Sequence, residues 1–425
     1  MLIEFSVKNF RSINERQVLN FVAKSSKEFQ DENTFIAGGV SKLRLINSIA
    51  IYGPNASGKT NILKAFSTMR NIVVNFSSNQ QRGDGLPVDP FLLNEESKIS
   101  PSEFYAEFIV NDVRYQYGFS LTRKRIHEEW LYAFPKGRVQ EWFHREWNNS
   151  AEDYDWYLGP KLLGEKSVWV KSTRENALFL STAVQLNNAQ FQPVFDWFKN
   201  NCKIANIDGW GENFSVRMCK KDRKKDILKF LKTADLGISD IKITDLPIPS
   251  IGFPDGMPEE IKQDIINSIK KDGGMVDIDF VHETPSGQKM TLSLLEESLG
   301  TSRLFAFAGP WIDCLENGYI FFIDELHQHL HPKLVSFLVS LFHNKETNPN
   351  NAQLVFTTHE TSILNEGVLR RDQIVFCEKN EELSSQYSYL SEFKVQKGRN
   401  IELGYLSGRY GAIPFLKNYL DVKKN

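Results

Sequence analysis

The sequence has few cysteines and lacks any paired thiol motif. Its four cysteines, Cys202, Cys219, Cys314 and Cys377, are scattered over 425 residues, and none belongs to a CxxC pair. This spacing excludes a cysteine zinc site and a dithiol redox motif. Scattered thiols are typical of proteins from a reducing compartment, so we expect a cytoplasmic protein.

Long hydrophobic runs and an excess of either charge are also missing. The longest apolar stretches, Leu304–Ile312 and Tyr319–Ile323, are far shorter than the roughly 20 residues that span a bilayer. The first residues contain no apolar region of a secretory signal. Lys and Arg number 51 against 53 Asp and Glu, which leaves a net charge of −2. We therefore expect no membrane partner and no constitutive coating of nucleic acid.

What the chain does contain is enough apolar material for a large core. Hydrophobic residues make up 41% and charged residues 24%, both close to globular averages, and the length predicts two or three domains. Apolar and polar residues alternate over Leu2–Phe10 and Glu103–Leu121, and the Asn111–Asp112 turn in the second stretch predicts an antiparallel hairpin. Aromatic-rich strands are expected at 126–134 and 139–147.

The pattern changes to helices from about residue 161. Helices are expected at 176–188, 192–200, 222–235 and 258–271, within a mostly helical insertion over residues 161–279. Beyond it the pattern predicts a strand at 277–283, a long helix at 292–314, a buried strand at 319–323, a helix at 332–342 and a buried strand at 353–357.

A glycine-rich loop lies between an apolar strand, Ile46–Tyr52, and an expected helix, Lys59–Met69. The loop matches GxxxxGK[ST] and consists of Gly53, Pro54, Asn55, Ala56, Ser57, Gly58, Lys59 and Thr60. In such a loop, backbone N–H groups surround phosphates, the lysine reaches the β- and γ-phosphates, and the Thr60 hydroxyl ligates Mg²⁺. The strand and helix around it favour this interpretation over an ordinary glycine loop, so we expect ATP and Mg²⁺.

Two acids end the apolar strand at 319–323. Asp324 is expected to hold Mg²⁺, directly or through water, and Glu325 to polarise the water that attacks the γ-phosphate. A strand that ends in two solvated acids is common by itself. Together with the glycine loop, the pair favours nucleotide hydrolysis.

Two further segments indicate the subclass. His359 follows the strand at 353–357 and is expected to sense the γ-phosphate by hydrogen bonding. Ser298 and Gly300 open a helix and could present a hydroxyl and a backbone N–H to a phosphate. Alone, His359 is an ordinary polar residue and Ser298 a helix N-cap. Their order along the chain favours the phosphate roles.

In this order the motifs resemble the ABC-type AAA ATPases of the SMC and RecF clade. The resemblance covers Asn9-Phe10-Arg11-Ser12 and residues from about 280 to 365. It implies an α/β P-loop NTPase of the ABC/SMC head type, with a mixed sheet core and an antiparallel β lobe. The ATPase domain would be divided into residues 1–160 and 280–425 by the insertion.

The resemblance also implies roles for single residues. Gly53–Thr60 would be the Walker A loop, and Asp324 with Glu325 the Walker B pair. Ser298 and Gly300 would belong to the signature, with 330–332 as the D-loop region. Lys59, Glu325 and His359 would be catalytic, and Arg11 would lie near the nucleotide. The family's Q-loop glutamine has no counterpart around 90–94, which leaves that magnesium ligand open.

The same resemblance implies partners. In this family two ATP molecules lie in a head-to-tail dimer, between the Walker A loop of one protomer and the signature of the other. Residues 174–181, 369–376 and 404–414 further resemble the abortive-infection ATPases of the RloA and AbiLi type, related to the AriA subunit of a phage-defence pair. This implies an ATPase whose ATP-dependent dimer or higher homo-oligomer senses infection, with a phage protein as trigger. It would hold or release a separate effector such as a TOPRIM-type nuclease or toxin. The segment after His359 is too short for a TOPRIM domain in this chain.

Other functions stay open. A RecF- or SMC-like DNA repair ATPase would use the basic cluster 220–225, although its interleaved acids favour a solvated helix face. No long heptad run predicts a coiled-coil arm. A scaffold with an inactive nucleotide site is disfavoured by the intact motifs. His327, His329 and His331 alternate as metal ligands in a strand would, but they fall in an expected turn.

Overall fold

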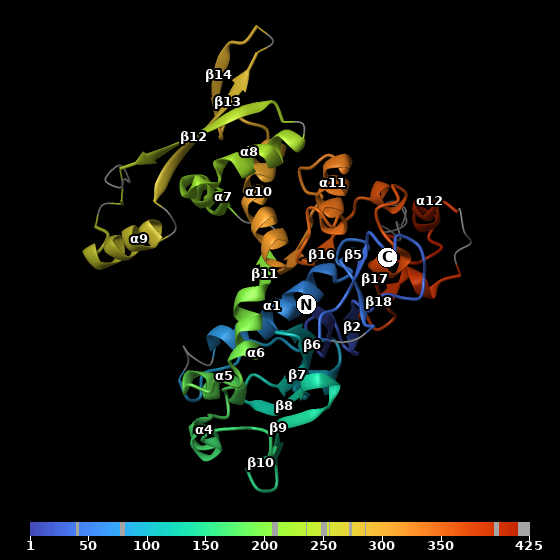
Figure 1. The fold of residues 1–425 in the computed structure, drawn as a ribbon. Coiled ribbons are helices and arrows are strands. Elements are labelled where there is room, and N and C mark those ends of the chain that lie inside the picture. Colours follow the sequence, from blue (N-terminus) through green and yellow to red (C-terminus); the bar gives the residue numbers. More distant parts are fainter. Residues whose placement is uncertain are drawn as a thin grey trace, which may run out of the picture.

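The computed structural model describes residues 1–39, 42–76, 81–205, 211–234, 236–247, 253–254, 256–271, 274–284, 286–394 and 399–414. The last residues of the predicted C-terminal part, 415–425, therefore lie outside the described chain. Two sheets form most of the body, and a smaller sheet forms an arm at one end (Figure 1).

The core sheet has six strands in the order β11-β15-β16-β5-β17-β18. Their bounds are Cys202–Ala205 (β11), Ile320–Ile323 (β15), Gln353–Thr357 (β16), Ser48–Tyr52 (β5), Ile374–Lys379 (β17) and Ser385–Tyr389 (β18). All neighbours pair in parallel except β17 and β18. Every residue of β5, β15 and β16 is buried, as continuous apolar runs covered on both faces require. The predicted buried strands at 319–323 and 353–357 are confirmed.

The second sheet is an antiparallel lobe of seven strands in the order β10-β9-β8-β7-β6-β1-β2. Their bounds are Asp153–Leu158 (β10), Gln140–Asn148 (β9), Ile126–Phe134 (β8), Val113–Leu121 (β7), Ser102–Val110 (β6), Leu2–Lys8 (β1) and Gln17–Asn20 (β2). The predicted hairpin joins β6 and β7, and both turn residues, Asn111 and Asp112, have positive φ, as a twisted two-residue turn needs. The α/β class, the mixed core sheet and the antiparallel lobe are confirmed.

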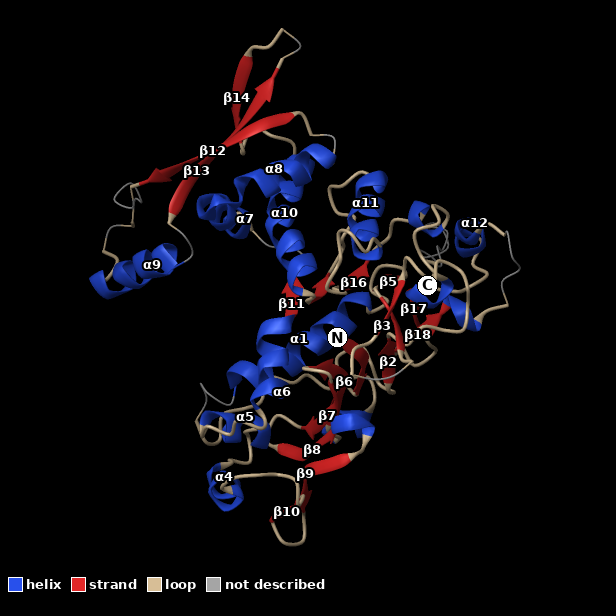
Figure 2. Ribbon diagram, in the orientation of Figure 1, coloured by secondary structure: helices blue, strands red, loops and turns tan. Residues whose placement is uncertain are grey.

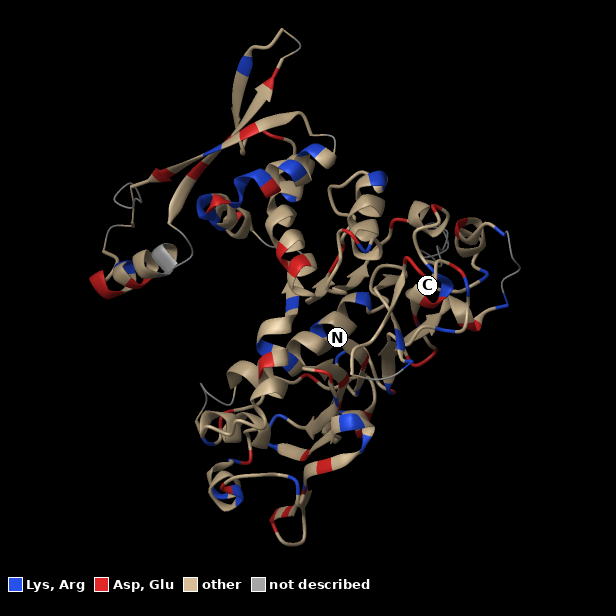
Figure 3. Ribbon diagram, viewed as in Figure 1, with Lys and Arg blue, Asp and Glu red and all other residues tan. Residues whose placement is uncertain are grey.

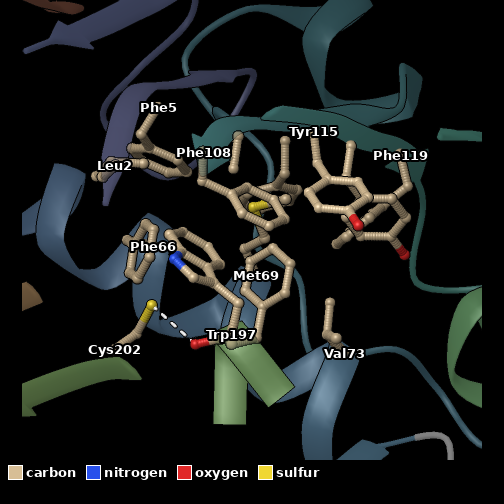
Figure 4. Close-up of a cluster of buried hydrophobic side chains, with 14 of the residues drawn as sticks. Leu2, Phe5, Phe66, Met69, Val73, Phe108, Tyr115, Phe119, Trp197 and Cys202 are labelled. Atoms are coloured by element: carbon tan, nitrogen blue, oxygen red, sulfur yellow. Dashed lines mark hydrogen bonds between the residues drawn. The ribbon is translucent and has the colours of Figure 1, made fainter. Parts of the chain in front are cut away.

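One hydrophobic core joins the two sheets through helix α1 (Lys59–Asn71). Phe66 of α1 stacks on Phe322 of β15 with ring centroids 4.2 Å apart. Trp197 stacks on Phe108 of β6 at 3.8 Å (Figure 4). At the other end of the interface, the side-chain amide of Gln353 both accepts a hydrogen bond from the backbone N of Leu2 (2.7 Å) and donates one to its carbonyl (2.9 Å). The lobe is therefore fixed directly to the strand that precedes His359.

Within residues 161–279, β11 belongs to the core sheet, and the other elements form two separate groups. Helices α4 (Lys166–Ser172), α5 (Phe179–Gln185) and α6 (Gln192–Asp196) follow the lobe, with α5 and α6 packed into its core. Helix α8 (Lys224–Thr233) packs against the arm strand β12 (Ile238–Leu246) and against α10 (Leu299–Asn317), and helix α7 (Asn213–Met218) packs against α10. Helix α9 (Glu259–Lys271) lies between β12 and β13 (Met275–Glu283) in the chain. The domain boundaries at 161 and 279 stay a prediction.

The arm sheet has the order β12-β13-β14, with bounds Ile238–Leu246, Met275–Glu283 and Lys289–Ser293. It lies at the end of the molecule opposite β10 (Figures 1 and 2). The long helix predicted over 292–314 is wrong at its start, because residues through Ser293 pair with β13. Helix α10 instead runs Leu299–Asn317, and the Ser298 hydroxyl, which accepts a hydrogen bond from the backbone N of Thr301 (3.1 Å), caps it.

The remaining elements complete the body. They are β3 (Thr34–Ile36), β4 (Arg44–Ile46), α3 (Glu95–Ile99), α11 (Pro332–His343) and α12 (Ile401–Leu406). Within the described ranges, no helix combines the length and the apolar composition that crossing a bilayer demands.

Candidate functional site

The glycine-rich loop connects β5 to α1, and two of its glycines are required by space and by backbone conformation. A Cβ at Gly53 would lie 2.1 Å from the carbonyl oxygen of Cys377, and one at Gly58 would lie 2.1 Å from the Ser385 hydroxyl. Gly58 also has φ 109°, a value that side chains rarely allow. The loop therefore lies directly against β17 and β18.

The start of α1 presents unused donors. Gly58 is its N-cap and supplies no side-chain cap, so the first N–H groups of the helix have no side-chain acceptor. The Ser57 hydroxyl is buried without a hydrogen-bond partner among the described residues. Free N–H groups at a helix N-terminus favour an anion such as phosphate.

The Lys59 side chain is folded back under this loop. Its ammonium donates hydrogen bonds to the carbonyls of Gly53 (2.9 Å) and Pro54 (3.0 Å). Burial lowers the pKa of Lys59, whereas the nearby Glu325 and Asp324 oppose that shift. The lysine thus shares one electrostatic environment with both acids.

Asp324 and Glu325 follow β15, and Thr357 at the end of β16 orients both. The Thr357 hydroxyl donates to Asp324 Oδ1 (2.6 Å) and accepts a hydrogen bond from the backbone N of Glu325 (2.8 Å). Glu325 has φ 51°, an uncommon conformation for a residue with a side chain. Asp324 Oδ2 is buried and has no partner in the described part of the chain.

His359 lies beside these acids. Its Nε2 is buried and unpartnered among the described residues, and its backbone N donates to Nδ1 of His327 at 3.4 Å. Burial, Lys59 and His327 lower the pKa of His359, and Glu325 and Asp324 oppose this. The neutral imidazole is therefore the dominant form at pH 7, with one ring nitrogen available to a ligand.

A network of polar side chains, which sequence reasoning missed, supports the loop from behind. Ser385 donates to the carbonyl of Ser57 (2.6 Å) and pairs with the Ser12 hydroxyl (2.8 Å), which also accepts from Asn61 (2.6 Å). Tyr387 donates to the carbonyl of Gly58 (2.8 Å). Ser12 belongs to the Asn9–Ser12 motif noted in the sequence. No local pattern indicates that Ser385 and Tyr387 support the loop, because they follow it by more than 300 residues.

Arg11 lies at the edge of this network, in an open cleft. Its guanidinium pairs with Asp89 at 3.2 Å, and it has φ 51°. The cleft has a volume of about 1030 Å³ and is bordered by Ser12 and Asn61 as well. Arg11 therefore borders the same cleft as Asn61 in the first turn of α1. Its neighbour Ser12 is linked to the phosphate loop through Ser385.

Ser298 and Gly300 lie apart from the phosphate loop of their own chain. The Ser298 hydroxyl bonds to Thr301, and a Cβ at Gly300 would lie 3.0 Å from the carbonyl oxygen of His329. Gly300 therefore lies against the segment after the two acids. In the described chain, no hydrogen bond joins Ser298 or Gly300 to Gly53–Thr60.

The residues at the loop fit a magnesium ion. Mg²⁺ prefers oxygen ligands and in nucleotide sites takes one or two from the protein and the rest from phosphate and water. The Thr60 hydroxyl and the open oxygen of Asp324 match this donor set. No cluster of three or more His, Cys, Asp or Glu side chains suited to a metal occurs in the described ranges.

The three alternating histidines have separate environments. The His327 ring lies edge-on to His359 with centroids 5.5 Å apart, His329 has φ 62°, and His331 Nδ1 caps α11 by accepting from the backbone N of Lys333 (3.2 Å). Burial lowers the pKa of His327. His327 therefore packs beside His359, whereas His331 serves as a helix cap, and the three histidines do not share one environment.

Comparison with known proteins connects this geometry to one family. A family model described as "AAA domain, putative AbiEii toxin, Type IV TA system" matches residues 48–158 and 219–365. The matched blocks contain the phosphate loop, Ser298, both acids and His359. No curated protein matches the sequence.

Solved structures of SMC heads are similar at low identity. One is an SMC head bound to the C-winged helix domain of ScpA (14% identity, 91% of this chain and 97% of that chain, TM-score 0.40). Another is the SMC head domain from Thermotoga maritima (13%, 91% and 98%, TM-score 0.38). A third is an Smc head with an extended coiled coil bound to the C-terminal domain of ScpA, derived from Pyrococcus furiosus (14%, 92% and 97%, TM-score 0.37).

Proposed function

We propose, because this chain belongs to the AAA domain family described as putative AbiEii toxin of a Type IV TA system, that it binds ATP with Mg²⁺ and hydrolyses it to ADP and phosphate. One observation carries the proposal. Lys59, Asp324, Glu325 and His359 meet where β5, β15 and β16 end, and two buried polar atoms there, Asp324 Oδ2 and His359 Nε2, have no protein partner among the described residues. Buried polar atoms in folded proteins are mostly hydrogen-bonded to protein, water or ligand, so these two are open to Mg²⁺ and phosphate.

Each side chain has a task in this proposal. Lys59 exchanges the carbonyls of Gly53 and Pro54 for the β- and γ-phosphates. Thr60 and Asp324 hold Mg²⁺, which would neutralise phosphate charge when bound. Glu325 accepts the proton of the attacking water, and His359 Nε2 contacts the γ-phosphate.

A second copy of the chain completes the site. The exposed position of Ser298, and the contact of Gly300 with His329 rather than with the phosphate loop, support a head-to-tail dimer in which these residues reach the partner's nucleotide. ATP would then control self-association. We propose further, from the resemblance of the sequence to abortive-infection ATPases and a family description that names a putative toxin, that the nucleotide state controls a separate effector in antiviral defence.

Two substitutions test the proposal. Glu325→Gln is expected to bind ATP, lose turnover and accumulate as a dimer, while Lys59→Ala loses ATP binding because nothing replaces the ammonium. Glu381→Gln, at an exposed acid of the β17–β18 turn, is the matched control and keeps wild-type turnover. Equal turnover in wild type and Glu325→Gln would overturn the assignment.

The DNA-binding alternative depends on the basic cluster 220–225 around the start of α8 (Figure 3). Three of its five basic side chains are paired in the structure: Lys224 with Asp240 at 2.7 Å, Arg223 with Glu316 at 2.6 Å and with Asp226, and Lys220 with Asp245. These ion pairs weaken its attraction for phosphates. Duplex binding that falls steeply with salt would revive the alternative, whereas binding absent at 50 mM salt would end it.

A further inference from the structure

The loop before α10 and the first residues of that helix, 294–300 together and called the loop below, expose two leucines next to the residues proposed to reach a partner's nucleotide. Leu295 is 95% exposed and Leu299 is 67% exposed, although apolar side chains of this size are usually buried. Between them lie Glu296, which is exposed, and Glu297, whose side chain is largely buried against His282, followed by Ser298, so Glu296 carries the exposed negative charge and the loop contains no basic residue. The loop therefore presents an apolar surface with a negative charge.

The cleft beside Arg11 has the opposite charge and the same apolar character. Leu92, Leu93 and Ile99 line it and are themselves exposed. Its border has one acid, Asp89, which pairs with both Arg11 and Arg123, and Lys98 pairs with Glu95 beside the cleft. Lys124 and Lys379 add positive charge that no acid on the border offsets. An acidic apolar loop is complementary to such a cleft in both charge and hydrophobicity.

We propose that the two surfaces bind each other between copies of this chain: Leu295 and Leu299 of one protomer pack on Leu92, Leu93 and Ile99 of its partner. The proposal rests on the ATP-bound dimer proposed above and identifies the contact that holds it. In a twofold dimer the same contact forms twice, so neither copy keeps an exposed apolar loop.

The chain dimensions agree with this pairing. The cleft is bordered by Asn61 in the first turn of α1 and by Ser12, which the Ser385 hydroxyl connects to the phosphate loop at Ser57. Leu295 precedes Ser298 by three residues, a reach of about 10 Å at most. If Ser298 approaches the partner's nucleotide, the leucines come within range of the cleft next to it.

The cleft could hold either the leucines of a second copy or part of the nucleotide. The nucleoside part of ATP could also fill a space next to the phosphate loop. The exposed leucines on the loop favour the second copy, because a nucleoside would leave them in water in the dimer as well as in the monomer. The experiment separates the two occupants.

Cross-linking between chains tests the contact. All four native cysteines are buried, so introduced thiols react selectively. In the Glu325→Gln background, one tagged chain carries Leu295→Cys and a second, differently tagged chain carries Leu93→Cys. A bismaleimide is expected to join the two chains with ATP and Mg²⁺ present and not without ATP. Leu163→Cys, 70% exposed between β10 and α4, replaces Leu295→Cys as the control and gives no cross-link.

The affinity of the dimer is the second readout. Leu295→Asp, at a position too exposed to affect folding, is expected to raise the dimer dissociation constant about a hundredfold, because two leucine contacts are lost per dimer. ATP affinity of the monomer should stay within about twofold. Lys124→Glu should also weaken the dimer, and less so at high salt, because its positive charge meets the acidic loop.

Three outcomes count against the inference. If the parent chain dimerises with ATP but Leu295→Asp dimerises as well and no cross-link forms, the contact is wrong and the proposed dimer stands. If Leu93→Asp loses ATP affinity while Leu295→Asp changes nothing, the cleft holds the nucleoside. If the Glu325→Gln chain binds ATP and stays monomeric, the dimer itself fails.

Discussion

Glu129 in the lobe and Asp324 in the core sheet are both buried carboxylates, 0% and 3% exposed, with opposite surroundings. Glu129 accepts four hydrogen bonds: from Arg145 (2.9 Å), Tyr117 (3.0 Å) and the backbone N of Phe179 (2.7 Å) and of Leu180 (3.1 Å). Asp324 accepts one, from Thr357, and its second oxygen has no partner among the described residues.

The number of hydrogen-bond partners distinguishes a buried carboxylate that stabilises the fold from one that can bind a ligand. Glu129 joins β8, β9 and α5, so its full set of donors serves the fold. Asp324 keeps an oxygen free where three strands of the core sheet end, as an ion or ligand would require. A buried charge by itself therefore does not indicate a site, and an open oxygen indicates one only where, as at Asp324, it lies beside the phosphate loop, because Arg145 Nη1 in the lobe is also without a partner among the described residues.

The largest expected effect is on stability and concerns Glu129. Glu129→Ala leaves the Arg145 guanidinium buried without its counterion, which we expect to cost about 3 to 5 kcal/mol of unfolding free energy. Urea denaturation measures this cost. Glu128→Ala, a half-exposed neighbour paired with His144, is the control and should cost less than about 1 kcal/mol. Equal losses for the two variants would contradict the comparison.

In contrast to Glu129→Ala, Asp324→Asn should lower ATP turnover and leave the stability of the fold unchanged. We expect ATP turnover to fall about a hundredfold, equivalent to roughly 2.7 kcal/mol in the barrier, because the neutral amide is a poor ligand for Mg²⁺. Steady-state ATPase assays over a Mg²⁺ titration measure the loss. The melting temperature should not drop. A variant that melts well below wild type would show Asp324 to be structural, like Glu129.

His343 offers an intermediate case, a buried titratable group inside a satisfied network. Its Nε2 meets the Ser48 hydroxyl at 2.8 Å, and burial lowers the pKa of His343 from 6.5 to about 3. Between these two pKa values, His343 is protonated in the unfolded chain and neutral in the folded chain. The contribution to stability is full above pH 6.5 and is lost progressively as pH falls toward 3, by roughly 2 kcal/mol at pH 5.

Unfolding of wild type and His343→Gln at pH 7 and pH 5 checks this. The variant should lose roughly 2 kcal/mol less than wild type between the two pH values. Identical pH dependence of the two proteins would mean that His343 titrates normally in the fold.

Thr357→Val should have the smallest effect. It keeps the shape of the side chain but removes the hydroxyl that orients Asp324 and Glu325, so we expect about a tenfold loss of turnover with ATP binding retained. Thr347→Val, which removes an exposed hydroxyl after α11, should leave turnover unchanged. A loss of ATP binding as large as the loss of turnover would show that Thr357 supports the loop instead.

Local motifs explain which parts of the site could be predicted. Gly53–Thr60, Asp324 with Glu325, and His359 each follow a short apolar strand, so sequence alone identified them, and parallel pairing of those strands brings them together. The start of α10 was misplaced because the choice between strand and helix at 289–293 depends on pairing with β13. Thr357 ends the strand predicted at 353–357, but its two hydrogen bonds to Asp324 and Glu325 form only because β15 and β16 lie side by side.

The sequence alone determined the α/β class, the phosphate loop and the polar ends of the buried strands, because each depends on residues near one another in the chain. The tertiary structure decided which buried polar atoms stay open and which are satisfied, since the partners of Ser57, Glu129 and Asp324 come from distant segments. It also placed an acidic apolar loop and a basic apolar cleft on the surface of one chain. Long-range packing sets both, and no local pattern encodes it.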